Sequence, residues 1–133
     1  MRELVFLLGR VLVSLVLLDN AYNHLANTDQ STGYAEYKGV PNARLMVQLT
    51  GVLMALGGVA IILGIWIDLA GLCVAALMII FAVKMHDFWT VTDFQQKGSE
   101  RAHFMKNISI AGAGLILASL GPVDFYTLTD GVF

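Results

Sequence analysis

The sequence predicts an all-α membrane protein: one domain, residues 1–133, folded as an antiparallel bundle of four transmembrane helices near 4–26, 44–66, 69–89 and 103–121. Hydrophobic residues make up 57% of the chain before glycine is counted, and mean hydropathy is +0.72. Soluble proteins have about 45–50% apolar residues with glycine included, and about 25% charged residues. Here only 14% are charged, too few to cover a solvated surface. Each apolar segment approaches the roughly 20 helical residues that cross a bilayer.

The first span is expected to be a retained helix. A cleaved signal peptide needs an uninterrupted apolar centre and a small-residue cleavage site, but Arg10 interrupts this segment and no such site follows. The next segment, 27–43, is rich in Ser, Thr, Asn, Asp and Gly, which is typical of a loop. Pro41 suits the entry of the second helix.

The second and third spans are joined by Trp66-Ile67-Asp68-Leu69, which is long enough only for a tight turn. They are therefore expected to be antiparallel neighbours, and an aromatic beside a charge is typical of a membrane interface. The polar segment 90–102 is expected to be a second loop, and Gly121-Pro122 ends the fourth span.

With four spans, both termini and the Trp66–Leu69 turn share one membrane side, here called the terminal side. The segments 27–43 and 90–102 share the other, here called the loop side. Basic residues favour the loop side, which has Lys38, Arg44, Lys97, Arg101 and Lys106, whereas the terminal side has Arg2 and Arg10. The positive-inside rule then predicts a multi-pass plasma-membrane protein with both loops in the cytoplasm.

Charge and cysteine content exclude two kinds of function, nucleic-acid binding and paired-cysteine redox chemistry. The formal net charge is −2 and the eight Lys and Arg residues are scattered, so there is no basic footprint for nucleic acid. Cys73 is the single cysteine, so neither an intrachain disulfide nor a C-x-x-C motif can form. It is expected to be a small packing or lipid-facing residue.

Small residues recur at spacings that let membrane helices approach closely: Gly51, Ala55, Gly58, Gly71, Ala75, Gly114 and Ala118. Packing within the bundle is the favoured interpretation. Dimerisation through one of these faces, giving a homo-oligomer, is the alternative.

Arg10 is the clearest polar residue inside a span, about 9 Å from Leu4 at a rise of 1.5 Å per residue. It lies within about 100° of Ser14, Asn20 and His24 around the helix, which predicts a polar stripe facing the bundle. The alternative is an arginine that snorkels to the headgroups.

Most other polar residues of the spans gather at the loop side, where four helix ends meet. We expect a ligand site there for an anionic or quinone-like molecule. The alternative is the ordinary enrichment of such residues at interfaces. The candidate ligand-binding residues are Arg10, from the polar stripe, together with His24, Arg44, Gln48, His86, Asp87, Trp89, Lys106 and Asn107.

No metal or haem site is expected. The three histidines, His24, His86 and His103, lie on separate expected helices, none forms an i, i+4 pair with another, and none lies deep in a span.

Four motifs together resemble the DoxX family of small four-helix membrane proteins. These are Arg10 early in the first helix, Gly39-Val40-Pro41, His86-Asp87-Phe88-Trp89 and Phe104-Met105-Lys106-Asn107. The residues that match the family pattern are Arg10, Gly39, Pro41, His86, Trp89, Lys106 and Asn107. The resemblance implies the architecture, and it brings no agreed catalytic role for any residue. Similar families include the membrane subunits of thiosulfate:quinone oxidoreductases, and other DoxX-like proteins are associated with redox stress or quinone-related metabolism, so the resemblance implies a link to redox chemistry only loosely.

Two functional hypotheses remain open. The first is a non-catalytic or quinone-binding membrane subunit that associates with the other subunits of a redox complex. The second is a carrier for a small solute or lipid, or a membrane scaffold, with no redox role. Catalysis by this chain alone is not expected, because it has neither a nucleotide-binding fingerprint nor a nucleophile beside a base.

Overall fold

The computed structural model describes residues 1–120 and 126–132, and within these residues the regular structure is entirely helical. The all-α class is therefore confirmed, with five α-helices where four were expected. They are α1 (Arg2–Ala26), α2 (Thr28–Tyr37), α3 (Ala43–Leu63), α4 (Ile67–Met85) and α5 (Phe94–Ser119), with a 3-10 turn, η1 (Phe88–Thr90), between the last two.

Three segments of the described chain are long and apolar enough to cross a membrane: Arg2–Ala26, Ala43–Leu63 and Ile67–Thr90. Their outward faces carry exposed apolar side chains, such as those of Leu12, which is 66% exposed, and Leu56, which is 63% exposed. Many exposed apolar side chains on long helices are typical of contact with lipid. The expected membrane helices are thus confirmed for the first three spans, whereas α5 does not meet the same criterion.

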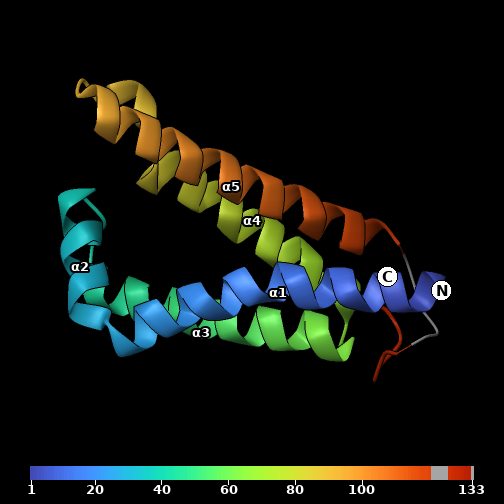
Figure 1. The fold of residues 1–133 in the computed structure, drawn as a ribbon. Helices are drawn as coiled ribbons and strands as arrows, with labels where there is room; N and C mark the ends of the chain where they lie inside the picture. The colour runs from blue at the N-terminus through green and yellow to red at the C-terminus, as the bar shows by residue number, and fades with distance from the viewer. Residues whose placement is uncertain (121–125, 133) are drawn as a thin grey trace.

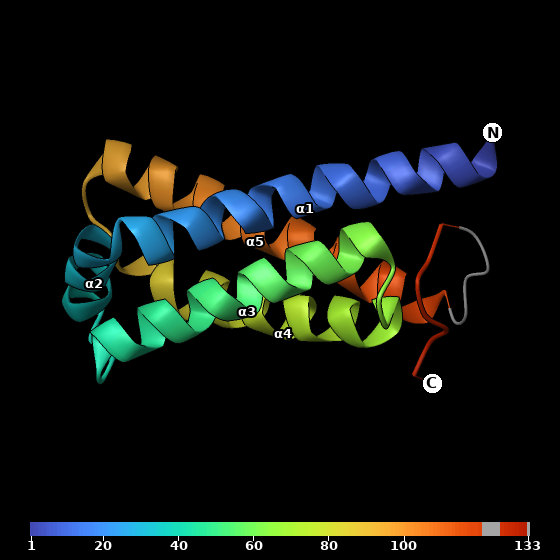
Figure 2. The same cartoon turned by 90° about the horizontal axis from the view of Figure 1, so that it is seen from below.

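The helices form two antiparallel pairs, α1 with α3 and α4 with α5 (Figure 1). The pairs lie close together at the terminal side, where a sharp turn connects α3 to α4, and they diverge toward the loop side. Helix α2 stands across the open end, as Figures 1 and 2 both show. This divergence positions the site described below.

Small residues let the backbones of α4 and α5 approach each other closely. A Cβ atom added to Gly114 would lie 2.6 Å from the carbonyl oxygen of Gly71, and one added to Gly71 would lie 2.5 Å from that of Gly114. Gly58 has the same role between α3 and α1, where an added Cβ would lie 3.0 Å from Cδ2 of Leu18. These small residues therefore serve packing within the chain, the favoured interpretation above.

The loop expected over 27–43 is wrong, because Thr28–Tyr37 forms α2. Its polar composition hides a helix whose buried positions, Thr32 and Ala35, are three residues apart and so share one face. Gly39, at φ +70°, ends the helix: its N–H donates to the Glu36 carbonyl and that of Val40 to Ala35. A left-handed glycine of this kind is a common helix stop.

The expected loop 90–102 is also largely wrong. Helix α4 ends at Met85 rather than at residue 89, and α5 begins at Phe94 rather than at 103. Asp93 caps α5, since its side chain accepts a hydrogen bond of 2.8 Å from the Gln96 N–H. An Asp followed three residues later by Gln is a recognisable helix-start pattern. The stop expected at Gly121-Pro122 lies outside the described residues.

At the terminal side, the buried guanidinium of Arg10 binds the end of α3. Its Nε donates to the Ile61 carbonyl at 2.8 Å, and Nη2 donates to the carbonyls of Ile62 and Tyr126 at 2.6 and 2.7 Å. The last carbonyls of a helix lack partners within that helix, so Arg10 caps α3 from α1. With only 1% of its surface exposed, Arg10 does not snorkel, and that interpretation is wrong.

Candidate ligand-binding site

A cavity of about 350 Å³ lies at the loop side, in the space between the diverging pairs. All five helices contribute to its wall. The apolar lining consists of Ala35, Val40, Met46, Val47, Ile80, Phe81 and Met85. The polar lining consists of Asn20, His24, Tyr34, Thr50, Lys84, His86, His103, Lys106 and Asn107. An apolar cavity with a few convergent polar groups is the usual form of a small-molecule site.

His24 reaches the cavity from α1 and is oriented by α3. Its Nδ1 lies 3.2 Å from the Val47 carbonyl oxygen and 3.0 Å from Oγ1 of Thr50. Because the Thr50 hydroxyl itself donates to Met46 at 2.8 Å, the consistent assignment has Nδ1–H of His24 as the donor. Nε2 is then left as an acceptor, and the ring packs against Phe81 with 5.9 Å between centroids.

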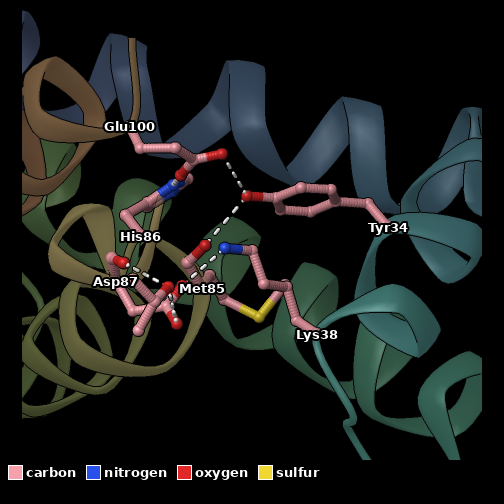
Figure 3. Close-up of polar contacts among 7 residues, drawn as sticks. Tyr34, Lys38, Met85, His86, Asp87 and Glu100 are labelled. Carbon is pink, nitrogen blue, oxygen red and sulfur yellow. Dashed lines mark hydrogen bonds and ion pairs between the residues drawn. The ribbon is translucent and has the colours of Figure 1, made fainter. Parts of the chain in front are cut away.

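A group of hydrogen-bonded residues lies beside the cavity where α2, the end of α4 and α5 meet (Figure 3). The Tyr34 hydroxyl lies 2.8 Å from the Met85 carbonyl oxygen and 2.9 Å from Oε1 of Glu100. Oε2 of Glu100 accepts a 2.8 Å hydrogen bond from Nδ1 of His86. The His86 ring in turn stacks on His103, with 5.1 Å between centroids. Both carboxylate oxygens of Glu100 are therefore occupied.

The single O–H of Tyr34 is shared between Glu100 and the last carbonyl of α4, which has no partner inside its own helix. Burial, with the hydrogen bond and negative charge of Glu100, raises the pKa of the Tyr34 hydroxyl above its usual value. The phenol is therefore protonated, and acts as a donor, throughout the physiological pH range.

An ion pair ties α2 to the same neighbours. Nζ of Lys38 lies 2.5 Å from Oδ1 of Asp87, and the Lys38 side chain is only 8% exposed (Figure 3). Thr90 donates a further 2.9 Å hydrogen bond to Oδ2 of Asp87. Tyr34, on α2, and Lys38, directly after its last turn, thus connect this helix to the α4–α5 pair across the open end of the molecule.

Of the residues expected to bind a ligand, the structure brings four together around the cavity: His24, His86, Lys106 and Asn107. Asp87 lies beside them and is paired with Lys38. The five come from α1, α5 and the residues that follow α4, whose loop-side ends lie in one layer as the helix order predicts.

The other four lie elsewhere. Arg10 is at the terminal side, bound to the end of α3. Arg44 is exposed and forms a 2.6 Å ion pair with Asp29, and Gln48 is also exposed and outside the cavity wall. Trp89 is 52% exposed and packs edge-on against Phe104, with 5.9 Å between centroids.

Sequence reasoning missed the residues that organise the site, above all Tyr34, Lys38 and Glu100. All three lie in segments expected to be loops, so they had no assigned partners. The spacing of Tyr34 and Lys38 by four residues, which places both on one face of a helix, is a signal that could have found two of them.

The fold and the site together define a helical integral membrane protein with a ligand-sized cavity at one membrane interface. The DoxX family matches residues 5–87, and the chain belongs to this family. The match includes α1 to α4 and ends before α5, which contributes His103, Lys106 and Asn107 to the cavity.

The chain is also similar to the inner membrane protein YphA of Escherichia coli (strain K12). The two are 27% identical over 121 residues, which cover 91% of this chain and 86% of YphA. No solved structure matches.

Proposed function

We propose that the chain is a ligand-binding membrane subunit that holds the ring of a quinone in the loop-side cavity and presents it to a redox partner. The observation that carries this proposal is the cavity itself, about 350 Å³ of mainly apolar space between two helix pairs, with several hydrogen-bond donors in its lining. In this role the chain binds and positions the ring, and electron transfer belongs to the partner oxidoreductase.

The lining suits the chemistry of a quinone, an apolar ring with two carbonyl acceptors. Phe81, Val47 and Ile80 offer apolar and aromatic surface to the ring. Lys106 and Asn107 supply N–H donors of the kind that carbonyl oxygens accept. Such a ligand would reach the site from the bilayer, because three of the helices that form the walls, α1, α3 and α4, are long and apolar enough to cross the membrane.

A cavity-filling substitution tests the proposal. Val47 is buried and lines the cavity, whereas Val52, on the same helix, is 45% exposed and lies outside it. Val47→Phe should weaken binding of a ubiquinone analogue to the purified protein at least about tenfold, a loss of about 1.4 kcal/mol. Val52→Phe, the same chemical change, should leave the affinity unchanged.

Equilibrium binding of the analogue to protein in lipid nanodiscs measures both variants, with thermal stability checked for each. Equal affinity of the wild type and Val47→Phe would place the quinone elsewhere. An absence of saturable binding to the wild type would remove the quinone assignment.

We further propose that α5 crosses the membrane as the fourth span, with the loop side in the cytoplasm. Helix α5 has 26 residues, about 39 Å at 1.5 Å per residue, and it runs antiparallel to α4 along most of its length (Figure 1). Because Arg10 is buried, Arg2 is left as the exposed basic residue of the terminal side, which strengthens the positive-inside argument.

Cysteine labelling checks this topology in a Cys73→Ser background. A membrane-impermeant maleimide added to intact cells should label Leu128→Cys at the terminal side and leave Gln95→Cys unlabelled until the membrane is opened. Labelling of both positions from one side would show that α5 does not span. Labelling of Gln95→Cys alone would reverse the orientation.

A further inference from the structure

Apart from the phenol of Tyr34, which is protonated, the ionisable side chains that line the cavity are all basic. Lys84 comes from α4 and Lys106 from α5, and the histidines are His24, His86 and His103. No Asp or Glu is among the lining residues. The cavity therefore combines an apolar interior with an excess of cationic and neutral donors.

The nearby carboxylates do not neutralise the two lysines. Asp87 is paired with Lys38, and both oxygens of Glu100 are taken by Tyr34 and His86. Within residues 1–120 and 126–132, neither Lys84 nor Lys106 has a carboxylate within ion-pair distance. By contrast, Lys38 and Arg44 both have acidic partners.

An unpaired ammonium group beside apolar walls favours a negatively charged ligand. Attraction between opposite charges is stronger where the surroundings are less polar than water, and hydrogen bonds between charged groups are about twice as strong as neutral ones. Lys106 is half-buried in such a position, and Lys84 lines the same cavity with its side chain exposed. Lys97 and Arg101, on the same helix as Lys106, are exposed and lie outside the cavity.

We infer that the cavity selects an amphiphile whose polar end carries a negatively charged oxygen. The oxyanion lies beside Lys84 and Lys106, and the apolar part lies against Val47, Ile80 and Phe81. This rests on the proposed function, in that the cavity is taken as the ligand site, and it adds the charge of the ligand's head group. A quinone with an ionised hydroxyl and a lipid-derived phosphate monoester both have this chemistry.

Three probes separate head-group charge from ring shape: a hydroxynaphthoquinone that is ionised at neutral pH, its neutral methyl ether, and dodecyl phosphate, which has the charge without the ring. We expect the wild type in nanodiscs of neutral lipid to bind the ionised naphthoquinone at least about tenfold more tightly than the ether. Dodecyl phosphate should compete with it.

The double variant Lys84→Gln/Lys106→Gln should lose most of this preference. The matched control Lys97→Gln/Arg101→Gln, with the same change in net charge, should keep it. Lys84→Arg/Lys106→Arg retains both positive charges and should also keep the preference for the ionised naphthoquinone. This variant controls for effects of replacing the lysines that do not depend on charge.

The outcomes distinguish this inference from the proposed function. Equal binding of both naphthoquinones by the wild type and the double glutamine variant would overturn the inference and leave the quinone proposal standing. Lysine-dependent binding of dodecyl phosphate without binding of either naphthoquinone would support the inference and overturn the quinone proposal. Binding of no probe would overturn both.

Discussion

Replacing Arg10 with methionine should destabilise the protein by about 3 kcal/mol. The variant loses three hydrogen bonds from a charged donor, and bonds of this type contribute about 1.5–3 kcal/mol each. The carbonyls of Ile61 and Ile62 at the end of α3 then lack their donors, in a region with little water to replace them. Methionine also removes the desolvation cost of the buried guanidinium charge. The expected loss of stability is therefore smaller than the sum of three hydrogen-bond contributions.

Arg10→Lys separates geometry from charge. A single ammonium group cannot reproduce the planar fork that reaches three carbonyl oxygens, so this variant should recover only part of the loss. Arg2→Met, on the exposed start of the same helix, is the control and should be neutral.

The midpoint of thermal unfolding in nanodiscs measures all three variants. An unchanged midpoint for Arg10→Met would show that Arg10 is not the cap of α3. Wild-type stability in Arg10→Lys would show that charge alone is sufficient.

Replacing Gly114 with valine should destabilise the protein by a similar amount, about 3 kcal/mol. The new Cβ would lie 2.6 Å from the backbone oxygen of Gly71, 3.2 Å from the Ala75 nitrogen and 3.3 Å from its Cβ. Backbone atoms cannot rotate aside as a side chain can, so α4 and α5 must separate. Overpacking of this kind costs about 1–3 kcal/mol, and a clash with backbone lies at the upper end.

Gly112 provides the matched control, because it lies on the same helix and an added Cβ meets no atom within 4 Å. Gly112→Val should be neutral or slightly stabilising, since valine has the higher helix propensity. Thermal unfolding again gives the readout. Equal effects of the two substitutions would mean that the contact between α4 and α5 is looser than the structure shows.

The sequence predicts three of the membrane helices within a few residues, because hydropathy and length are local properties. It misplaces the segments between them for reasons that are not local. Helix α2 is polar, and its helical form depends on burying Thr32 and Ala35 against the rest of the fold. The start of α5 is different, since Asp93 and Gln96 show it directly and the signal was overlooked.

The candidate site is predicted in part, because helix order brings the loop-side ends of the spans to one layer. Which residues of each helix face the cavity depends also on the rotation of that helix about its axis, which helix order does not determine. Ala43, Val47 and Gly51 face the core at intervals of four residues, so Arg44 and Gln48, about 100° further round α3, face outward. Residue types at a helix end could not distinguish these two faces.

Membrane residence, the helical class and the location of polar chemistry at the loop side were determined by the sequence alone, since they follow from composition and order along the chain. Only the tertiary structure decided that the helices form two diverging pairs, with a cavity where they part. It also decided which groups the buried guanidinium of Arg10 binds. Arg10 needs acceptors at its own depth, and those acceptors are carbonyls some fifty residues and more than a hundred residues away, brought within reach only by packing.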